Sequence, residues 1–276
     1  MTDLGRRLLR HRGALVGLII LAALALMAMG APWLSPRDPI KTAPRAALQA
    51  PGAGYWLGSD QLGRDVASRV VHGARISLTV GLIAVTIAVV VGAPIGLVAG
   101  FYGGRLDSFV MRVMDVLLAF PGILLALAIV SVLTPGLTNV MIAVGLSAVP
   151  TYARLVRGSV LAARENLYVE AARALGIRDP SILARHILPN VVAPLVVTAT
   201  LGLGTAILAA AALSFIGLGS QPPQPEWGRM LSEGRDYLRE AWWISTFPGL
   251  GIMLTVLGMN LLGDGLRDVL DPRLKA

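Results

Sequence analysis

The chain has 276 residues, of which 55% are hydrophobic and only 14% charged, and its 24 Lys and Arg against 16 Asp and Glu give a formal net charge of +8. Soluble domains carry about 25% charged residues, so this composition excludes an ordinary soluble domain, a disordered chain and an ordinary nucleic-acid binder. The absence of cysteine excludes a disulfide scaffold, and a polytopic membrane protein remains.

Uncharged stretches locate the membrane spans, because a spanning helix needs about 20 apolar residues. The uncharged stretch between Asp115 and Arg154 is too long for one crossing, and Thr134-Pro135-Gly136 in its middle predicts the turn of a helical hairpin. We therefore expect an all-α polytopic membrane protein with six transmembrane helices, at about residues 14–33, 77–100, 114–133, 138–157, 191–215 and 245–263. Residues 1–76 would hold the N-terminal tail, the first span and an extracytoplasmic segment, and residues 77–276 a core of five helices.

An even number of spans places both termini on one side of the membrane. That side carries 15 of the Lys and Arg residues and the other side 9, which predicts that both termini are cytoplasmic. The segment 37–75 is more basic than this rule favours. Alternatively, the first span is a cleaved signal peptide, because Arg6-Arg7 precede it and Ala28-Met29-Gly30 resembles a cleavage site.

Proline and glycine mark the predicted spans. Each of the last five spans holds one proline, which either hinges the helix or serves its packing. A four-residue glycine repeat in the second span predicts a close helix contact, within the chain or between chains. Asp115, at the entrance of the third span, is either an interfacial residue or part of a proton relay. The residues concerned are Pro94, Pro121, Pro150, Pro194 and Pro248, and Gly92, Gly96 and Gly100.

Catalytic and metal-binding patterns are absent from the sequence, so we predict no catalytic residues and no metal site. His11, His72 and His186 are scattered, and no serine lies in a GxSxG turn. The two lysines, Lys41 and Lys275, do not follow a glycine-rich loop, so the chain lacks a phosphate-binding loop and would not itself hydrolyse ATP.

The segment of about 158–190 between the fourth and fifth spans is predicted to form a helix-turn-helix elbow on the cytoplasmic side. A first helix is expected over residues 160–175, with Gly176 as the residue that follows its C-terminus. Asp179-Pro180 would begin a second short helix that ends before Pro189.

This elbow contains Glu170-Ala171-Ala172, then Gly176 three residues later, and Leu188-Pro189 at its end. The pattern resembles the EAA loop of inner-membrane permease subunits of ABC importers, written as EAA, three residues, G, nine residues, I, one residue, LP. His186 stands where that pattern has isoleucine, and Ile187 follows it. The departure leaves the glycine-to-LeuPro spacing intact and places only the role of the isoleucine position in doubt.

Further matches extend over nearly the whole chain. Together they look like the C-type permease of dipeptide, oligopeptide and nickel importers. The matching stretches are Leu57-Gly58-Ser59-Asp60-Gln61-Leu62-Gly63-Arg64-Asp65, Phe101-Tyr102-Gly103-Gly104-Arg105-Leu106-Asp107, Ser214-Phe215-Ile216-Gly217-Leu218-Gly219, Pro225-Glu226-Trp227-Gly228, Gly263-Asp264-Gly265-Leu266-Arg267-Asp268 and Leu270-Asp271-Pro272.

The resemblance implies a non-enzymatic transport subunit in the bacterial inner membrane. Its partners would be a homologous sister permease, two ATPase subunits, a periplasmic or lipid-anchored solute-binding protein and the lipid bilayer, but no nucleic acid. ATP and Mg²⁺ would be bound by the ATPase subunits, and this chain would hold no cofactor. The residues implied to couple to the ATPases are Glu170, Ala171, Ala172, Gly176, Leu188 and Pro189.

Two other function classes compete with this interpretation. An intramembrane enzyme would place paired catalytic groups inside the spans, and none is seen. An energy-independent channel or scaffold would not need an ATPase-docking elbow. Peptides are favoured over nickel as the solute because the histidines show no metal-ligand spacing. The sequence identifies no substrate-binding residues.

Overall fold

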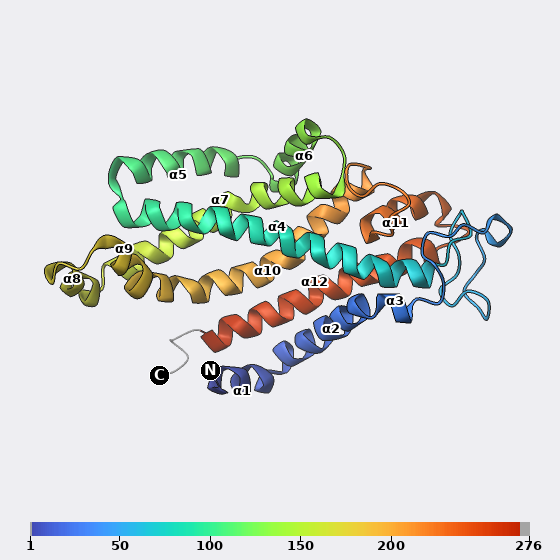
Figure 1. Cartoon of the computed structure of the whole chain (residues 1–276), viewed down its shortest axis with the longest axis horizontal. Coiled ribbons are helices and arrows are strands. Elements are labelled where there is room, and N and C mark those ends of the chain that lie inside the picture. The colour runs from blue at the N-terminus through green and yellow to red at the C-terminus, as the bar shows by residue number, and fades with distance from the viewer. Residues whose placement is uncertain (1, 271–276) are drawn as a thin grey trace.

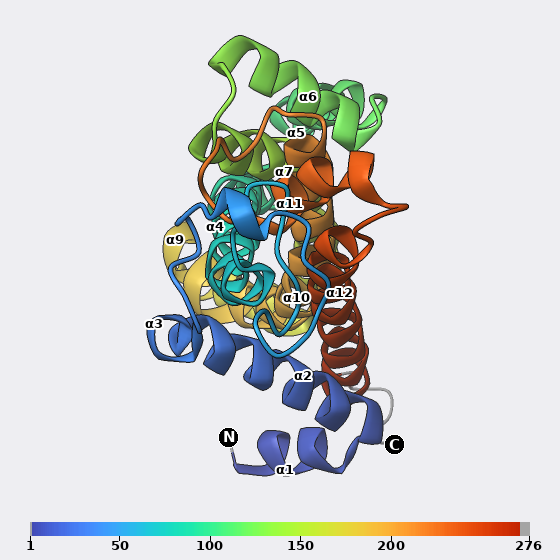
Figure 2. The same ribbon diagram turned by 90° about the vertical axis from the view of Figure 1, so that its right-hand side faces the viewer.

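The computed structural model describes residues 2–270, which form an elongated helical bundle without a β-strand. Four long helices follow the long axis of the bundle (Figure 1): α4 (Val66–Tyr102), α7 (Leu137–Arg164), α10 (Leu188–Phe215) and α12 (Trp243–Leu270). A further helix, α2 (Arg12–Met29), packs against α12 on the outside of this group (Figure 2). The prediction of an all-α polytopic protein is confirmed.

Shorter elements connect these helices or cap their ends. They are α1 (Thr2–Arg10), α3 (Ala31–Leu34), η1 (Pro44–Ala46), α5 (Gly104–Leu118), α6 (Gly122–Leu133), α8 (Leu167–Ala174), α9 (Asp179–Ile182), the π-helical turn η2 (Leu183–Ile187), α11 (Trp227–Gly234) and η3 (Arg235–Tyr237). Asp271 and Pro272 of the last sequence motif lie outside the described residues.

Five helices in the described chain are long and apolar enough to cross a membrane, and the number is six if α5 and α6 together form one span. The third predicted span, 114–133, is not one straight helix, because α5 and α6 meet at an angle of 91°. Pro121, which lacks an amide hydrogen, lies just before α6 and prevents α5 from continuing through it. Pro94, Pro150, Pro194 and Pro248 lie inside α4, α7, α10 and α12, as expected.

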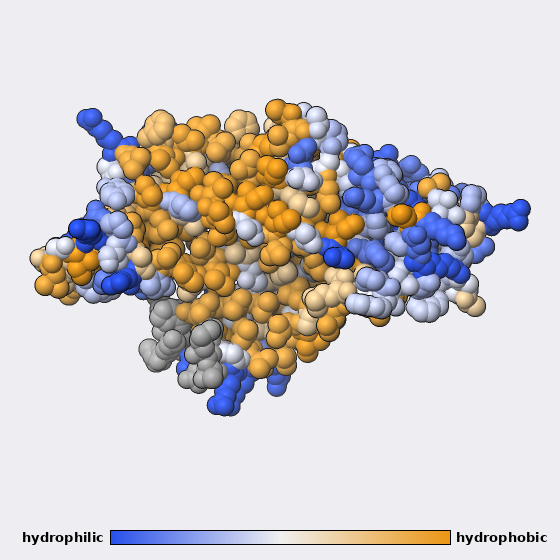
Figure 3. Space-filling model, viewed as in Figure 1, coloured by the Kyte–Doolittle hydropathy of each residue, from blue (hydrophilic) through white to orange (hydrophobic). Residues whose placement is uncertain are grey.

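The two ends of the bundle differ in character. We call the end that carries residues 165–187 the elbow end, and the end formed by residues 35–65 and 216–242 the loop end (Figure 1). On the face shown in Figure 3, hydrophobic residues cover most of the bundle between the two ends, whereas the loop end is largely hydrophilic. The 37 residues of α4 extend about 55 Å at 1.5 Å per residue, well beyond a hydrocarbon core of about 30 Å, so part of α4 must lie outside it.

Contacts near the chain ends bring the start of α2 and the end of α12 together on the elbow side of the bundle. The imidazole Nε2 of His11 lies 3.2 Å from a carboxylate oxygen of Asp268, and α1 also packs against α12. The described chain therefore begins and ends on one side, as an even number of crossings requires.

Ion pairs hold α5 along α7. The guanidinium of Arg157 donates two hydrogen bonds to the carboxylate of Asp107, at 2.5 and 2.6 Å. Asp115 pairs with Arg154, and more than half of each side chain is exposed. The structure thus places Asp115 in an exposed ion pair, not in a buried chain of titratable groups.

The glycine repeat of the second predicted span allows α4 and α7 to pack closely along their length. A Cβ atom on Gly92 would lie 2.8 Å from the carbonyl oxygen of Val149 and 2.9 Å from the Cβ of Tyr152, which is tighter than real Cβ contacts. Gly96 and Gly100 also face α7, at Val156 and Val160. Of the two possibilities left by the sequence, the repeat therefore serves packing within the chain.

We expect Gly92→Leu to destabilise the protein strongly, because it forces side-chain atoms against the backbone of α7, and overpacking alone costs about 1–3 kcal/mol. The measurement is the thermal unfolding midpoint in detergent. Gly158→Leu is the matched control, since Gly158 lies in α7 and nothing lies within 4 Å of its added Cβ. Equal midpoints for the two variants would contradict the packing role of Gly92.

Candidate functional site

The predicted elbow starts where α7 ends. The expected continuous helix over 160–175 is wrong, because the chain breaks at Glu165 and Asn166 between α7 and α8. The Asn166 amide donates hydrogen bonds to the carbonyl oxygens of Ala162 and Ala163, at 3.1 and 2.9 Å. It thereby satisfies carbonyls that the end of α7 leaves free, while its extended backbone turns the chain into α8.

Gly176 ends α8 in the way the sequence predicts. Its φ is +73°, in the left-handed region that glycine adopts without steric cost. The amide of Gly176 donates to the carbonyl of Arg173 at 2.9 Å, and that of Ile177 to the carbonyl of Ala172 at 3.1 Å. These two bonds form a Schellman motif, and Ile177 packs into the small hydrophobic core of the elbow.

The second arm of the elbow does not end before Pro189, contrary to the sequence expectation. α9, η2 and α10 follow one another without an intervening loop from Asp179 to Phe215. Pro189 cannot donate a backbone hydrogen bond, and the π-helical turn of residues 183–187 lies immediately before it. The wider turn lets the chain remain helical past the proline, so the elbow joins α10 directly.

The predicted coupling residues divide between two sides of the elbow. Glu170 and Ala171 are exposed on α8, whereas Ala172 is buried with Val169 in the elbow core. Gly176, Leu188 and Pro189 are exposed at the turn and at the start of α10. The structure therefore places Glu170 and Ala171 on one outward surface, whereas Ala172 points into the hydrophobic core of the elbow.

Large apolar side chains complete this outward surface. Leu167 is 81% exposed and Leu175 is 80% exposed, on either side of Glu170 and Ala171. We call the surface formed by Leu167, Glu170, Ala171 and Leu175 the α8 face. Exposed apolar side chains grouped on one surface are typical of a surface that contacts another protein.

His186, which departs from the sequence pattern, joins the two arms of the elbow. Its ring stacks on Tyr168 of α8, with ring centres 6.4 Å apart. Asn190 at the start of α10 donates hydrogen bonds to the Tyr168 hydroxyl at 3.1 Å and to the His186 carbonyl at 2.7 Å. These contacts link α8 directly to the first turn of α10.

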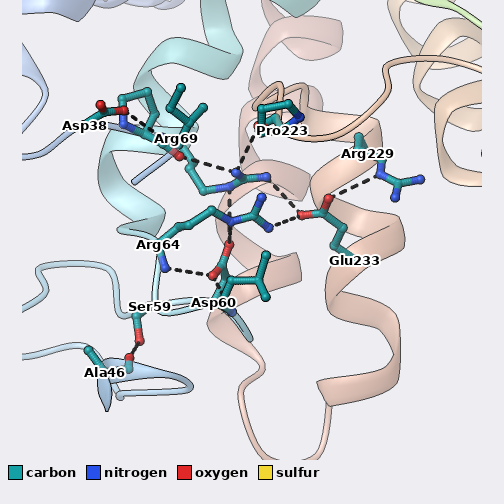
Figure 4. Close-up of polar contacts among 12 residues, drawn as sticks. Asp38, Ala46, Ser59, Asp60, Arg64, Arg69, Pro223, Arg229 and Glu233 are labelled. Atoms are coloured by element: carbon teal, nitrogen blue, oxygen red, sulfur yellow. Dashed lines mark hydrogen bonds and ion pairs between the residues drawn. The ribbon is translucent and has the colours of Figure 1, made fainter. Parts of the chain in front are cut away.

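The loop end contains a buried ion cluster that the spacing of charges in the sequence did not reveal (Figure 4). Arg64 lies 2.5 Å from the carboxylate of Asp60 and 2.7 Å from that of Glu233. Arg69 lies 3.0 Å from Glu233 and 3.6 Å from Asp60, and Arg229 also pairs with Glu233, at 3.3 Å. We call these five residues the loop-end ion cluster.

This cluster accounts for two of the six Lys and Arg residues in the segment 37–75. The side chains of Arg64 and Arg69 are only 2% and 1% exposed, and both are neutralised by carboxylates of the loop end. Two of the positive charges in the segment therefore serve its internal structure and place little charge on the surface. Asp60 and Arg64 of the matched motif at residues 57–65 are both members of this cluster.

Glu226, from another matched motif, begins α11. Its carboxylate accepts hydrogen bonds from the amides of Gly228 and Arg229, at 2.8 and 2.9 Å. Burial raises the pKa of the Glu226 carboxyl above its usual range, although these hydrogen bonds oppose the shift. The next residue, Trp227, is fully buried and donates its indole N–H to the carbonyl of Val70 at 3.0 Å. The motif thus attaches α11 to α4.

Among the described residues, no three or more His, Asp or Glu side chains lie together as a group that could hold a metal ion.

Two family models match the chain. The model described as binding-protein-dependent transport system inner membrane component matches residues 92–276, and that of the N-terminal TM domain of oligopeptide transport permease C matches residues 1–51.

Similar curated proteins cover almost the entire chain. A dipeptide transport system permease protein of Alkalihalophilus pseudofirmus is 50% identical over 98% of this chain and 89% of its own length. A di/tripeptide transport system permease protein of Pseudomonas aeruginosa is 47% identical over 96% of this chain and 89% of its own. A glutathione transport system permease protein of Escherichia coli is 48% identical over 98% and 89%.

Among solved structures, an inward-facing form of the MetNI methionine ABC transporter matches with a TM-score of 0.59. It covers 73% of this chain and 96% of the matched chain at 23% identity, and so shows a shared fold.

Proposed function

Since this chain belongs to the family of binding-protein-dependent transport system inner membrane components, we propose that it forms, with a sister permease, the path of an ATP-driven importer of di- and oligopeptides. It is a transport subunit, not an enzyme. In this proposal two ATPase subunits bind the elbow, and a solute-binding protein delivers the peptide at the loop end.

The single observation that carries the coupling role is the α8 face. It combines two exposed leucines with an exposed carboxylate on a short helix held by a glycine cap. A groove on an ATPase subunit would bury Leu167 and Leu175 and pair a cation with Glu170. Movement of the seated α8 would then reach α10 through the Tyr168–Asn190 hydrogen bond.

Peptides are the proposed solute because the similar proteins named above are a dipeptide, a di/tripeptide and a glutathione permease. Nickel appears in none of these three names and stays the alternative solute.

The test is purification of the complex through a tag on this chain, followed by reconstitution into vesicles. We expect an ATP-hydrolysing subunit to copurify and dialanine uptake to require ATP and the binding protein. Dialanine uptake without an ATPase would instead indicate an energy-independent channel, and nickel uptake without peptide uptake would reject the proposed solute.

The proposed orientation places the elbow end and both termini in the cytoplasm. A reporter that is active only in the cytoplasm should therefore be active when it is fused after Arg164, at the end of α7. It should be silent after Arg45 in the loop end. The rule that favours this orientation counts Lys and Arg residues, of which the side of the elbow and the termini carries 15 and the side of the loop end 9. Activity after Arg45 would reverse the assignment.

A further inference from the structure

A cavity of about 520 Å³ opens between α4, α6, α7, α10 and α12, in the apolar part of the bundle. A second cavity, of about 450 Å³, lies nearer the elbow end and is lined by α7, α10 and α12. Thr198 and Leu201 line both cavities, so the two are adjacent along α10. We call the two cavities together the α10 groove.

Uncharged polar side chains project into this groove from three apolar helices. Ser147 and Thr151 lie one turn apart on α7, Thr198 and Thr205 two turns apart on α10, and Asn260 on α12. Thr151, Thr205 and Asn260 are exposed. The hydroxyls of Ser147 and Thr205 each donate a hydrogen bond of 2.9 Å to a carbonyl of their own helix, which offsets their cost in an apolar bundle. Their oxygen atoms can still accept a hydrogen bond from a solute.

At its elbow end the groove is lined by a charged side chain as well as an amide. Asn190 and Arg267 line the second cavity, and Asn190 is also the residue that is hydrogen-bonded to Tyr168 of α8. The cationic Arg267 is exposed at the end of α12. The groove thus leads from uncharged hydroxyl and amide groups to a cation beside the coupling elbow.

We propose that the α10 groove is the inward-opening part of the solute path and that it takes the backbone of a short peptide in extended form. This inference rests on the proposed function and deepens it. Hydroxyl and amide groups both donate and accept hydrogen bonds, which suits peptide N–H and C=O groups of any sequence. Arg267 suits the C-terminal carboxylate of a peptide as it leaves.

The dimensions of the groove agree with this occupant. Thr205 and Asn190 are separated by about 22 Å along α10, at 1.5 Å per residue. An extended peptide spans at most about 3.3–3.6 Å per residue, so a dipeptide or a short oligopeptide fits within this length. No carboxylate or imidazole is among the described residues that line the two cavities, so the groove lacks the imidazole ligands that suit nickel.

The absence of cysteine from the chain makes a direct test possible. Thr198→Cys and Thr205→Cys each place one thiol in the groove. Thr200→Cys is the matched control, because Thr200 lies on the same helix but does not line either cavity. The probe is a small, cationic, water-soluble methanethiosulfonate reagent applied to the full complex in vesicles, without nucleotide.

We expect both groove thiols to react at least tenfold faster than the Thr200→Cys thiol. Dialanine uptake, measured for each variant before and after modification, should then fall at least tenfold for the groove variants only. Groove thiols as unreactive as the control would mean that lipid or the sister permease fills the groove. That result, or unchanged uptake after complete modification, overturns the inference.

The same assay separates this inference from the proposed function. If the complex that contains the natural, cysteine-free form of this chain takes up dialanine but modification of the groove has no effect, the groove is not the path, and the importer assignment stands. If that complex shows no ATP-dependent dialanine uptake, the proposed function fails, and the inference fails with it.

Discussion

Replacing Glu233 with glutamine is expected to destabilise the loop end by about 3–5 kcal/mol, the cost of removing one partner from a buried ion pair. The carboxylate of Glu233 is bonded to both Arg64 and Arg69, whose side chains are almost fully buried. The amide of glutamine cannot neutralise the two guanidinium groups, which have no access to bulk water. Trp227 and Trp243 are buried near this end, so intrinsic tryptophan fluorescence during thermal unfolding reports the change.

Two further variants make this prediction specific. Glu240→Gln removes a carboxylate that is exposed in the same loop end and should leave the unfolding midpoint nearly unchanged. Asp60→Asn should resemble Glu233→Gln, because Asp60 pairs with Arg64 at 2.5 Å and with Arg69 at 3.6 Å. If Glu240→Gln lowered the midpoint as much as Glu233→Gln, the effect would come from net charge and not from the buried cluster.

Replacing Gly176 with valine is expected to reduce retention of the ATPase subunits on the purified complex roughly tenfold. No atom lies within 4 Å of a Cβ added at Gly176, so a collision is not the cause. The cause is the φ of +73°, because a β-branched residue there costs about 1–2 kcal/mol, and each 1.4 kcal/mol corresponds to a factor of ten. The elbow would relieve this strain by giving up the Schellman motif, which moves the α8 face.

Gly158→Val is the control for this variant. Gly158 also has no neighbour within 4 Å of its added Cβ, but it lies inside α7 with helical backbone angles. ATPase retention should therefore stay close to the wild-type level in Gly158→Val. Wild-type retention in Gly176→Val would show that the elbow is only a solvated connector.

Glu170→Ala should impair a different property of the complex from Gly176→Val. Alanine preserves the helix and removes only an exposed charge, so the complex should assemble but transport less dialanine per ATP hydrolysed. Glu165→Ala is the matched control, because Glu165 is exposed at the end of α7 and lies outside the α8 face. If both variants transported the same amount of dialanine per ATP hydrolysed, Glu170 would have no specific part in coupling.

The sequence alone could predict the features that depend on residues close together in the chain, namely the positions of the long helices and the end of the first elbow helix. Long uncharged stretches located the helices, because the membrane requires continuous apolar segments with internally bonded backbone. Gly176 was recognisable as a helix end because glycine adopts the left-handed conformation there without steric cost, and the motif spacing around Glu170 pointed to the elbow. These are local requirements, and they can be read within a few turns of helix.

Local breaks inside the predicted elements were harder to foresee. The chain bends at Asn166, where its amide bonds to two carbonyls of α7, although the surrounding residues favour helix. Conversely, the helix continues past Pro189, because a π-helical turn precedes it. In both places helix propensity competes with a particular hydrogen-bond arrangement, and the sequence pattern does not state which one is the more stable.

Only the tertiary structure decided the arrangements that join distant residues. Glu233 meets Arg64 across 169 positions of the chain, so the spacing of charges contained no sign of the loop-end ion cluster. The α10 groove likewise combines Thr151 of α7, Thr198 of α10 and Asn260 of α12, each of which is by itself a single polar residue in an apolar helix. A side chain acquires such a role from the angle and register at which the helices pack, and these are set by contacts among all of the helices together.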